Sequence, residues 1–273
     1  MKKVWRLLIT PPAHGAWNMA ADEAILEAIG RGASLPTLRL YSWEPACLSL
    51  GYAQLSSDVD KARLQERGWE MVRRPTGGRA VLHTDELTYS VIAPLDEPRV
   101  AGSVLESYSR LAAALVEALR LLDLPVEIQE HTQASRQAPN PVCFEVPSNY
   151  EITVAGRKLV GSAQARRKEG LLQHGSLPLT GDLTRILQVL TFPNEEARQQ
   201  AASRLLERAT TVEAALGRKV SFSDAAKAFI DAFESVLDLH FQPGGLSPQE
   251  KARAGDLASA KYDDPDWNQK QKS

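Results

Sequence analysis

The chain has 273 residues, of which 43% are apolar and 24% are charged, with a formal net charge of −2 at pH 7. This composition is ordinary for a globular protein with an ample core, in one large domain or a domain with a small appendage. The near-neutral charge argues against a nucleic-acid-binding protein, which normally carries a clustered basic excess. No stretch approaches the ~18 apolar residues of a membrane span, so no membrane partner is expected.

The chain contains two cysteines, Cys47 and Cys143. The first residues show no secretory cleavage site, so we expect a cytoplasmic protein whose thiols stay reduced. Neither cysteine belongs to a CxxC pattern and no HExxH pattern occurs, so no metal site is expected. Cys47 opens a short apolar run and is predicted to be a buried, small apolar residue.

The first two-thirds of the chain predict mainly strands, with helices between them. Two strand-like runs at 37–43 and 47–53 flank Glu44-Pro45-Ala46, which predicts a hairpin. Apolar residues at helical spacing predict a long amphipathic helix at 103–122. The other elements expected here are strands at 4–10, 69–74, 86–94 and 124–128 and helices at 16–32 and 58–67.

The last third of the chain predicts mainly helices. The expected helices are at 182–190, 195–209, 212–216, 221–237 and 247–261, with a linker at 243–245. We therefore expect the α+β class, with a mixed, largely antiparallel sheet and flanking helices. One domain is expected over 1–245, and 246–273 are expected to form a C-terminal helix and tail packed on that domain.

The stretch RRPTGGRAVLH, residues 73–83, is the first candidate binding element. The paired Gly77 and Gly78 permit positive φ and let the backbone come close to a ligand. Their successive N–H groups can converge on one carbonyl or phosphate oxygen. The stretch is neither a P-loop nor a dinucleotide-binding fingerprint. A plain hairpin turn between two strands is the alternative interpretation.

The second candidate element is a predicted hairpin that follows Cys143. A strand-like run, YEITVAG, turns at Gly156 into a second run that opens with Lys158. A cation beside a thiol favours the reactive thiolate, and an amine can also accept and return its proton. Backbone N–H groups of the glycine loop could bind the oxyanion of an acyl-transfer intermediate. His83 and His174 are alternative bases, so a Cys–His pair stays open.

The chain resembles the family of lipoate–protein ligases and octanoyltransferases, which shares a catalytic domain with biotin protein ligases. The matching stretches cover nearly the whole chain: WNMAADEAIL (17–26), LRLYSWEPACLSLGYAQ (38–54), RRPTGGRAVLHTDELTYSV (73–91), GRKLVGSAQARRKEGLLQHGSL (156–177) and KYDDPDWN (261–268). Two details are similar to the LipM-type octanoyltransferase branch. The glycine loop reads Gly-Gly-Arg-Ala-Val where ligases typically read Gly-Gly-Gly-Ala-Val, and a cysteine precedes the lysine-bearing strand.

This resemblance implies a biotin/lipoate protein ligase-like catalytic domain over 1–245. It implies octanoyl transfer from octanoyl-acyl carrier protein to a lysine of a lipoyl domain, chiefly that of the glycine cleavage H protein. The reaction is implied to proceed through a thioester on Cys143, with Lys158 as its acid/base partner and no cofactor. The acyl site is implied to contain Arg73, Gly77, Gly78, Arg79 and His83, together with Gly161, Ser162 and Ala163. An apolar tunnel is expected beside the thiol, because burial stabilises an acyl chain by ~0.8 kcal/mol per methylene.

Two alternatives stay open. An ATP-dependent lipoate–protein ligase would use Lys158 to contact an acyl-adenylate and would leave Cys143 incidental. The other alternative is a relative that moves acyl groups between lipoyl domains, or one that only binds the acyl carrier. The chain has no room for the accessory domain of many ligases, which favours the transferase, and a monomer is expected. The basic run at 166–168 is either a solvated turn or a docking aid for an acidic partner.

Overall fold

The computed structural model of the chain describes residues 2–130 and 150–269. The strands are β1 (Lys3–Ile9), β2 (Thr37–Tyr41), β3 (Cys47–Leu50), β4 (Glu70–Arg73), β5 (Val81–His83), β6 (Glu86–Ala93), β7 (Val126–Glu130), β8 (Tyr150–Val154), β9 (Arg157–Arg167), β10 (Gly170–Pro178) and β11 (Leu239–Pro243). The α-helices are α1 (Gly15–Gly30), α2 (Lys61–Glu66), α3 (Val104–Arg120), α4 (Glu195–Arg208), α5 (Val212–Leu216), α6 (Phe222–Val236), α7 (Pro248–Leu257) and α8 (Pro265–Asn268). Short 3₁₀ segments lie at η1 (Ser56–Asp58) and η3 (Leu183–Val189), and a π-helical turn lies at η4 (Ala258–Tyr262).

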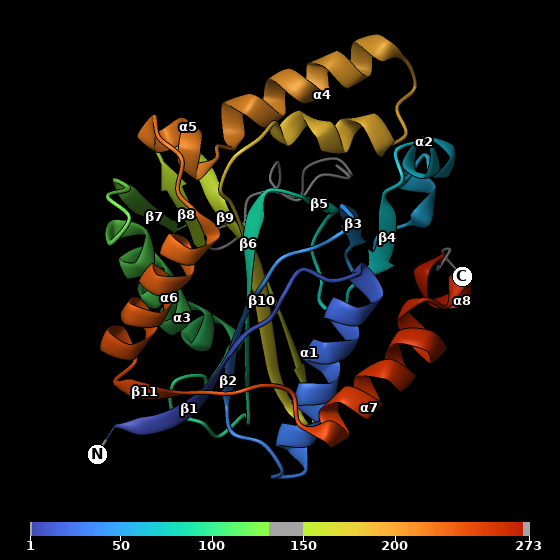
Figure 1. Cartoon of the computed structure of the whole chain (residues 1–273). Helices are drawn as coiled ribbons and strands as arrows, with labels where there is room; N and C mark the ends of the chain where they lie inside the picture. Colours follow the sequence, from blue (N-terminus) through green and yellow to red (C-terminus); the bar gives the residue numbers. More distant parts are fainter. Residues whose placement is uncertain (1, 131–149, 270–273) are drawn as a thin grey trace.

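The strands form a large sheet and a small one (Figure 1). The order in the large sheet is β11-β1-β2-β6-β10-β9-β8-β7. Strands β11 and β2 run parallel to β1, and the remaining neighbours are antiparallel. In the small sheet, β3 lies between β4, which is parallel to it, and β5, which is antiparallel. The predicted α+β class with a mixed, largely antiparallel sheet is confirmed.

Helices cover both faces of the large sheet, which makes β6 buried along its whole length. Leu87, Tyr89 and Val91 join the apolar core that contains residues of α3 and α6. Their neighbour Ile92 packs instead with residues of α1. Because side chains alternate along a strand, Thr88 and Ser90 lie on the α1 face too. Buried polar groups therefore collect on this face, and they need partners there.

The predicted helix at 103–122 is confirmed as α3, with boundaries set by its caps. The Ser103 hydroxyl accepts a hydrogen bond from the Glu106 N–H, and the Glu106 carboxylate accepts one from the Ser103 N–H. Leu111, Leu115 and Leu119 form the predicted apolar stripe and are buried in the core. The predicted helices of the last third are confirmed as η3, α4, α5, α6 and α7.

One sequence prediction about strands is wrong, and one strand was missed. The runs at 37–43 and 47–53 do not form a hairpin, because β2 lies in the large sheet and β3 in the small one. Both strands are fully buried, so their apolar runs gave no sign that they belong to different sheets. The strand β11 was not predicted; it pairs in parallel with β1, a contact between the two ends of the chain.

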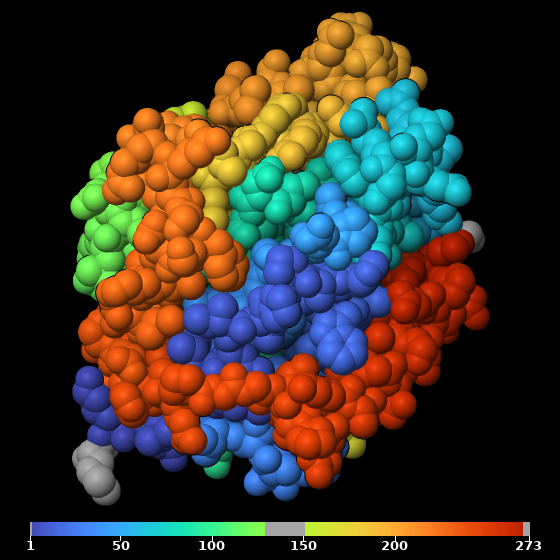
Figure 2. All heavy atoms as spheres, viewed as in Figure 1, coloured from blue at the N-terminus to red at the C-terminus, as the bar shows by residue number. Residues whose placement is uncertain are grey.

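The C-terminal segment packs along the N-terminal helix. In Figure 2, the last helices lie directly beside the N-terminal part of the chain. The Glu23 carboxylate of α1 accepts hydrogen bonds from Lys261 and Tyr262 and pairs with Arg167. The division of the chain at residue 245 stays a prediction. Within residues 2–130 and 150–269, no helix combines the length and apolar character that crossing a membrane requires.

A second buried carboxylate, Asp22, ties α1 to the large sheet. It accepts hydrogen bonds from Arg39 Nη1 at 2.8 Å, the Tyr41 hydroxyl at 3.0 Å and the Ser90 hydroxyl at 2.9 Å. Burial alone would raise the pKa of Asp22, but the Arg39 guanidinium and His174 outweigh burial and lower it. Asp22 is thus held as a carboxylate inside the protein.

We expect Asp22→Asn to lower the free energy of unfolding at pH 7 by about 3–5 kcal/mol, since it leaves the Arg39 charge buried without its counter-ion. The folded-state pKa of Asp22 lies below the unfolded value, so this stabilisation is lost as the pH falls below about 4. Urea denaturation at several pH values measures both effects. Asp96→Asn, at an exposed aspartate, is the control. Equal stability of the two variants at pH 7 would contradict the prediction.

Candidate active site

A pocket, here called the central pocket, lies where the two sheets meet beside α1. Its empty volume is about 400 Å³, including the part open to solvent. Its lining residues are Met19, Tyr41, Trp43, Ser49, Arg74, Val81, His83, Thr88, Gly161, Ser162, Ala163, His174, Gly175 and Ser176. The predicted site residues His83, Gly161, Ser162 and Ala163 are thus brought together in one pocket.

Small residues on β9 and β10 form one wall of the central pocket. Gly175 pairs with Ser162 across these strands. A Cβ atom at Gly175 would lie 2.5 Å from the Tyr89 ring and 2.7 Å from the carbonyl oxygen of Gly161. These distances exclude any larger residue at this position without a shift of the backbone. Because Gly161, Ser162, Ala163 and Gly175 are small, this wall has few side-chain atoms.

A buried carboxylate, Glu86, hydrogen-bonds three residues that line the pocket. It accepts hydrogen bonds from the hydroxyls of Thr88 and Ser176, and from His83 Nδ1 at 2.5 Å. Burial alone would raise the pKa of Glu86, but the charge and hydrogen bonds of His83, Ser176 and Thr88 outweigh burial and lower it. The other ring nitrogen of His83, Nε2, lies 2.7 Å from the Ser49 hydroxyl oxygen.

Arg74 connects this polar group to the glycine loop. Its guanidinium donates to the Ser49 carbonyl and hydroxyl oxygens at 3.0 and 3.1 Å. It also donates to the carbonyl oxygens of Gly77 at 2.9 Å and of Arg79 at 2.7 Å. The charged Arg74 side chain thus holds the glycine loop by hydrogen bonds to its carbonyl oxygens, and it also lines the central pocket. Arg74 was not among the predicted site residues.

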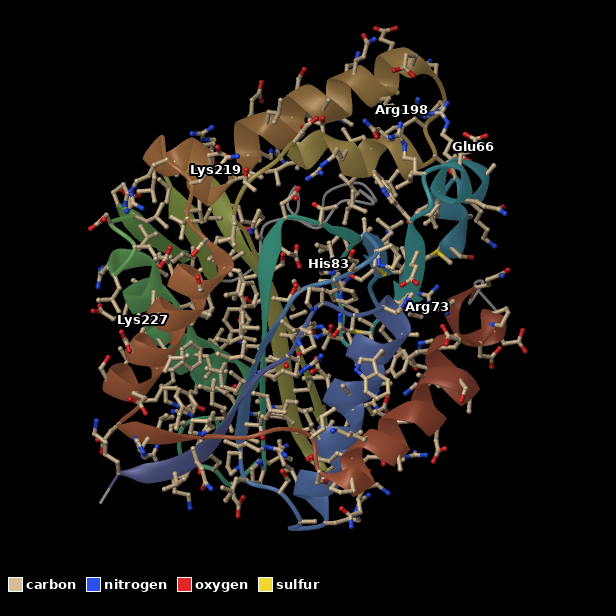
Figure 3. The ribbon with its side chains drawn as sticks, in the orientation of Figure 1. Glu66, Arg73, His83, Arg198, Lys219 and Lys227 are labelled. Atoms are coloured by element: carbon tan, nitrogen blue, oxygen red, sulfur yellow. The ribbon has the colours of Figure 1, made fainter. Side chains whose placement is uncertain are left out.

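The structure places the predicted site residue Arg73 away from the central pocket. The Arg73 side chain is buried and donates to backbone carbonyl oxygens, including those of Gly51, Gln54 and Trp267. Figure 3 shows His83 in the interior and Arg73 on the side of the C-terminal helices. Successive side chains of a strand point to opposite faces, so only one of two adjacent arginines can face the pocket. Burial lowers the pKa of Arg73.

The glycine loop is not a hairpin turn, and that alternative interpretation is wrong. Strands β4 and β5 do not pair with each other; each pairs with β3. The loop therefore crosses the end of β3, where Gly51 meets it: a Cβ atom at Gly51 would lie 1.9 Å from the Gly78 carbonyl oxygen. Gly78 has a φ of 91°, which favours glycine. Gly77 and Gly78 are exposed and Arg79 is half-buried. Their role in binding an acyl group or oxyanion stays a prediction.

His174 holds the loop from its other end. Its Nε2 lies 2.6 Å from the Thr76 hydroxyl, and its Nδ1 lies 3.8 Å from a carboxylate oxygen of Asp22. Burial lowers the pKa of His174, which keeps the imidazole neutral at pH 7 although Asp22 favours the charged form. Both histidines that the sequence suggested as alternative bases therefore lie between polar partners.

Lys158 is the second residue of β9 in the predicted hairpin, which is confirmed as β8 and β9. The turn contains Ala155 and Gly156 at positive φ. The Lys158 side chain is 6% exposed, and its Nζ lies 3.1 Å from Oε1 of Glu151, which was not among the predicted site residues. Cys143 lies outside the described residues, as does the rest of 131–149. Its pairing with Lys158 therefore stays a prediction.

Cys47 and the basic run at 166–168 make contacts within the fold and do not line the central pocket. Cys47 is fully buried, as predicted, and burial raises the pKa of its thiol well above the usual range. In the basic run, Arg166 donates to the Val100 carbonyl oxygen and Arg167 pairs with Glu23, so only Lys168 extends into solvent. The part of the chain that the structure describes contains no group of three or more histidine, cysteine, aspartate or glutamate side chains placed to hold a metal ion.

Comparison with known proteins places this geometry in a family. Residues 14–234 match the lipoyl protein ligase A/B catalytic domain. The octanoyltransferase LipM of Moorella thermoacetica is 45% identical over 267 residues, 97% of each chain. That of Kyrpidia tusciae is 42% identical over 271 residues, 97% of this chain and 98% of the other.

Solved structures of ligases share the fold. A bipartite lipoate protein ligase of Thermoplasma acidophilum superposes with a TM-score of 0.80 at 26% identity, covering 99% of each chain. A lipoate-protein ligase A bound with ATP gives a TM-score of 0.79 at 27% identity, covering 98% of this chain and 99% of the other. The chain therefore belongs to the lipoyl protein ligase A/B catalytic-domain family, in its LipM-type octanoyltransferase branch, and is an acyltransferase.

Proposed function

We propose that the chain transfers an octanoyl group from octanoyl-acyl carrier protein to a specific lysine of lipoyl domains, chiefly that of the glycine cleavage H protein. The relatives named octanoyltransferase LipM support octanoyl as the group, since their similarity extends over nearly the whole chain. One structural observation carries the proposal. The buried Lys158 lies on the same strand, β9, as the small residues that form the pocket wall.

The reaction divides into two transfers through Cys143. First, the Cys143 sulfur forms a bond to the thioester carbonyl carbon, and the bond from that carbon to the carrier's sulfur breaks. Lys158 takes the proton of Cys143 and gives it to the departing carrier thiolate. Second, the acceptor lysine amine attacks the new thioester, an amide forms and the Cys143 thiolate leaves. The amine loses a proton in this step, and the thiolate regains one.

The central pocket suits the acyl chain. Met19, Tyr41, Trp43 and Val81 supply apolar atoms, and the wall of β9 supplies space. Burying an eight-carbon chain there stabilises it by several kcal/mol, at ~0.8 kcal/mol per methylene. The polar groups around Glu86 hydrogen-bond one another, so they need no partner on the ligand.

An ATP-dependent lipoate–protein ligase is the second candidate, because a ligase bound with ATP shares the fold at 27% identity. In that case Lys158 contacts an acyl-adenylate and Cys143 takes no part. Transfer between lipoyl domains is a third outcome, in which an octanoylated lipoyl domain replaces the acyl carrier protein as donor. The donor that loads the enzyme, and the need for nucleotide, separate the three.

Incubation with octanoyl-acyl carrier protein without nucleotide should add one octanoyl group to the chain. We expect Cys143→Ser to abolish this adduct and Cys47→Ala to keep it, because Cys47 is buried away from solvent. Intact-mass spectrometry measures the adduct, and addition of a lipoyl domain should discharge it. Product that forms only with ATP, together with unmodified Cys143, would instead identify a ligase.

We expect Lys158→Ala to slow thioester formation about 10²- to 10⁴-fold, the usual contribution of a positioned acid/base group. A quenched time course of the octanoyl adduct measures the rate. Lys168→Ala is the matched control, since its side chain is 91% exposed on the turn between β9 and β10. A wild-type rate in Lys158→Ala would exclude Lys158 as the proton carrier.

A further inference from the structure

The hairpin that carries Lys158 has one apolar face and one polar face. Ile152 and Val154 of β8 join the core beneath α3, so their alternate neighbours Glu151 and Thr153 lie on the other face. Both of these polar side chains are largely buried: Thr153 is 1% exposed and the Glu151 side chain 12%.

An irregular register turns Lys158 toward this polar face. Thr153 pairs with Lys158, but Ile152 pairs with Val160, so Leu159 is an extra residue in β9. Leu159 and Val160 both enter the core, which is the usual result of a bulge. Lys158 lies opposite Thr153 and diagonal to Glu151, within reach of its long side chain. The Glu151 and Lys158 charges meet at 3.1 Å as a result.

Stability alone does not account for this pair. Removing two charges from water costs several kcal/mol per ion, and apolar residues of similar size are often at least as stable. A buried pair is useful where one partner must be held in place and kept charged.

We propose that Glu151 is a positioning residue for acyl transfer, which holds Lys158 Nζ in place and keeps it protonated. The inference rests on the proposed function. The Cys143–Lys158 pair then carries a single proton in its active form, and this proton sits on Lys158. The Cys143 thiolate attacks the thioester carbon, the carrier's C–S bond breaks, and Lys158 gives its proton to the departing sulfur. Glu151 acts on the reaction only through Lys158.

In the part of the chain that the structure describes, other charged groups on the neighbouring elements are less well placed for this role. Among the described residues, β7 contributes Glu127, which lies across from Thr153 and is exposed. Helix α4 contributes Arg208 at its end, which is also exposed. The segment after α4 contacts Lys158 through backbone, with the Thr210 N–H donating to the Lys158 carbonyl oxygen at 3.0 Å. Of these groups, Glu151 is the one at ion-pair distance from Nζ.

The test compares Glu151→Gln, Glu151→Asp and the control Glu127→Gln with the wild type. Single-turnover thioester formation from octanoyl-acyl carrier protein, without nucleotide, is followed by intact mass across pH and carrier concentration. Glu151→Gln should lower the limiting rate about 100-fold, as expected for a displaced catalytic group. The half-saturating carrier concentration should not change. Both limbs of the pH–rate profile should move to lower pH, because a nearby negative charge favours the protonated forms.

Glu151→Asp keeps the charge but shortens the side chain, so it should lose rate without moving the pH profile. A slower Glu151→Gln with an unmoved profile overturns the proposal, since a purely structural role predicts that result. A wild-type rate also overturns it. If melting curves show that the Glu151→Gln variant does not fold, the Glu151→Asp variant tests the proposal instead. A wild-type rate of thioester formation in Glu151→Asp then overturns the proposal. If the wild type forms no thioester without nucleotide, the proposed function is wrong, and the inference about Glu151, which rests on it, is wrong as well.

Discussion

The carboxylate of Glu86 is the contact on which the central pocket depends. It is buried at the start of β6, and its donors come from both sheets: His83 from β5 of the small sheet and Ser176 from β10 of the large one. A buried carboxylate is costly unless it is hydrogen-bonded. The two sheets must therefore meet at the distance and angle that satisfy Glu86, and this requirement leaves a pocket of defined shape between them.

The glycine loop depends on the same arrangement at both of its ends. From Glu86, the hydrogen bonds continue through His83 and Ser49 to Arg74, which holds the loop carbonyl oxygens. At the other end, Thr76 contacts His174, which lies beside the second buried carboxylate, Asp22. Two buried carboxylates thus fix one exposed loop. A loop fixed before substrate binds can offer its N–H groups without reorganisation, which is what stabilisation of an oxyanion requires.

Sequence patterns predicted the local features well and the long-range ones poorly. The α3 stripe and the β8–β9 hairpin follow from periodicity and a turn, and both were predicted. The separation of β2 from β3, and the pairing of β11 with β1, depend on contacts that no local pattern encodes. Arg73 and Arg74 are adjacent, so their side chains point to opposite faces. The sequence alone could not say which of the two lines the pocket. Glu151 was missed because an isolated glutamate in a strand is usually a solvated residue.

The long strand β9 connects the proposed chemistry to the acyl chain. Lys158 stands at its start, and the small residues of the pocket wall follow three to five positions later. Strand residues rise by about 3.3 Å each, so the wall begins about 10 Å from Lys158 along the strand. An acyl group lying along β9 would place its carbonyl carbon near Lys158 and its chain beside Gly161, Ser162 and Ala163. A single rigid element would then set both the position of the reacting carbon and the space for the chain. The bulge at Leu159 lies between these two parts of β9, so it separates the charged face around Lys158 from the pocket wall.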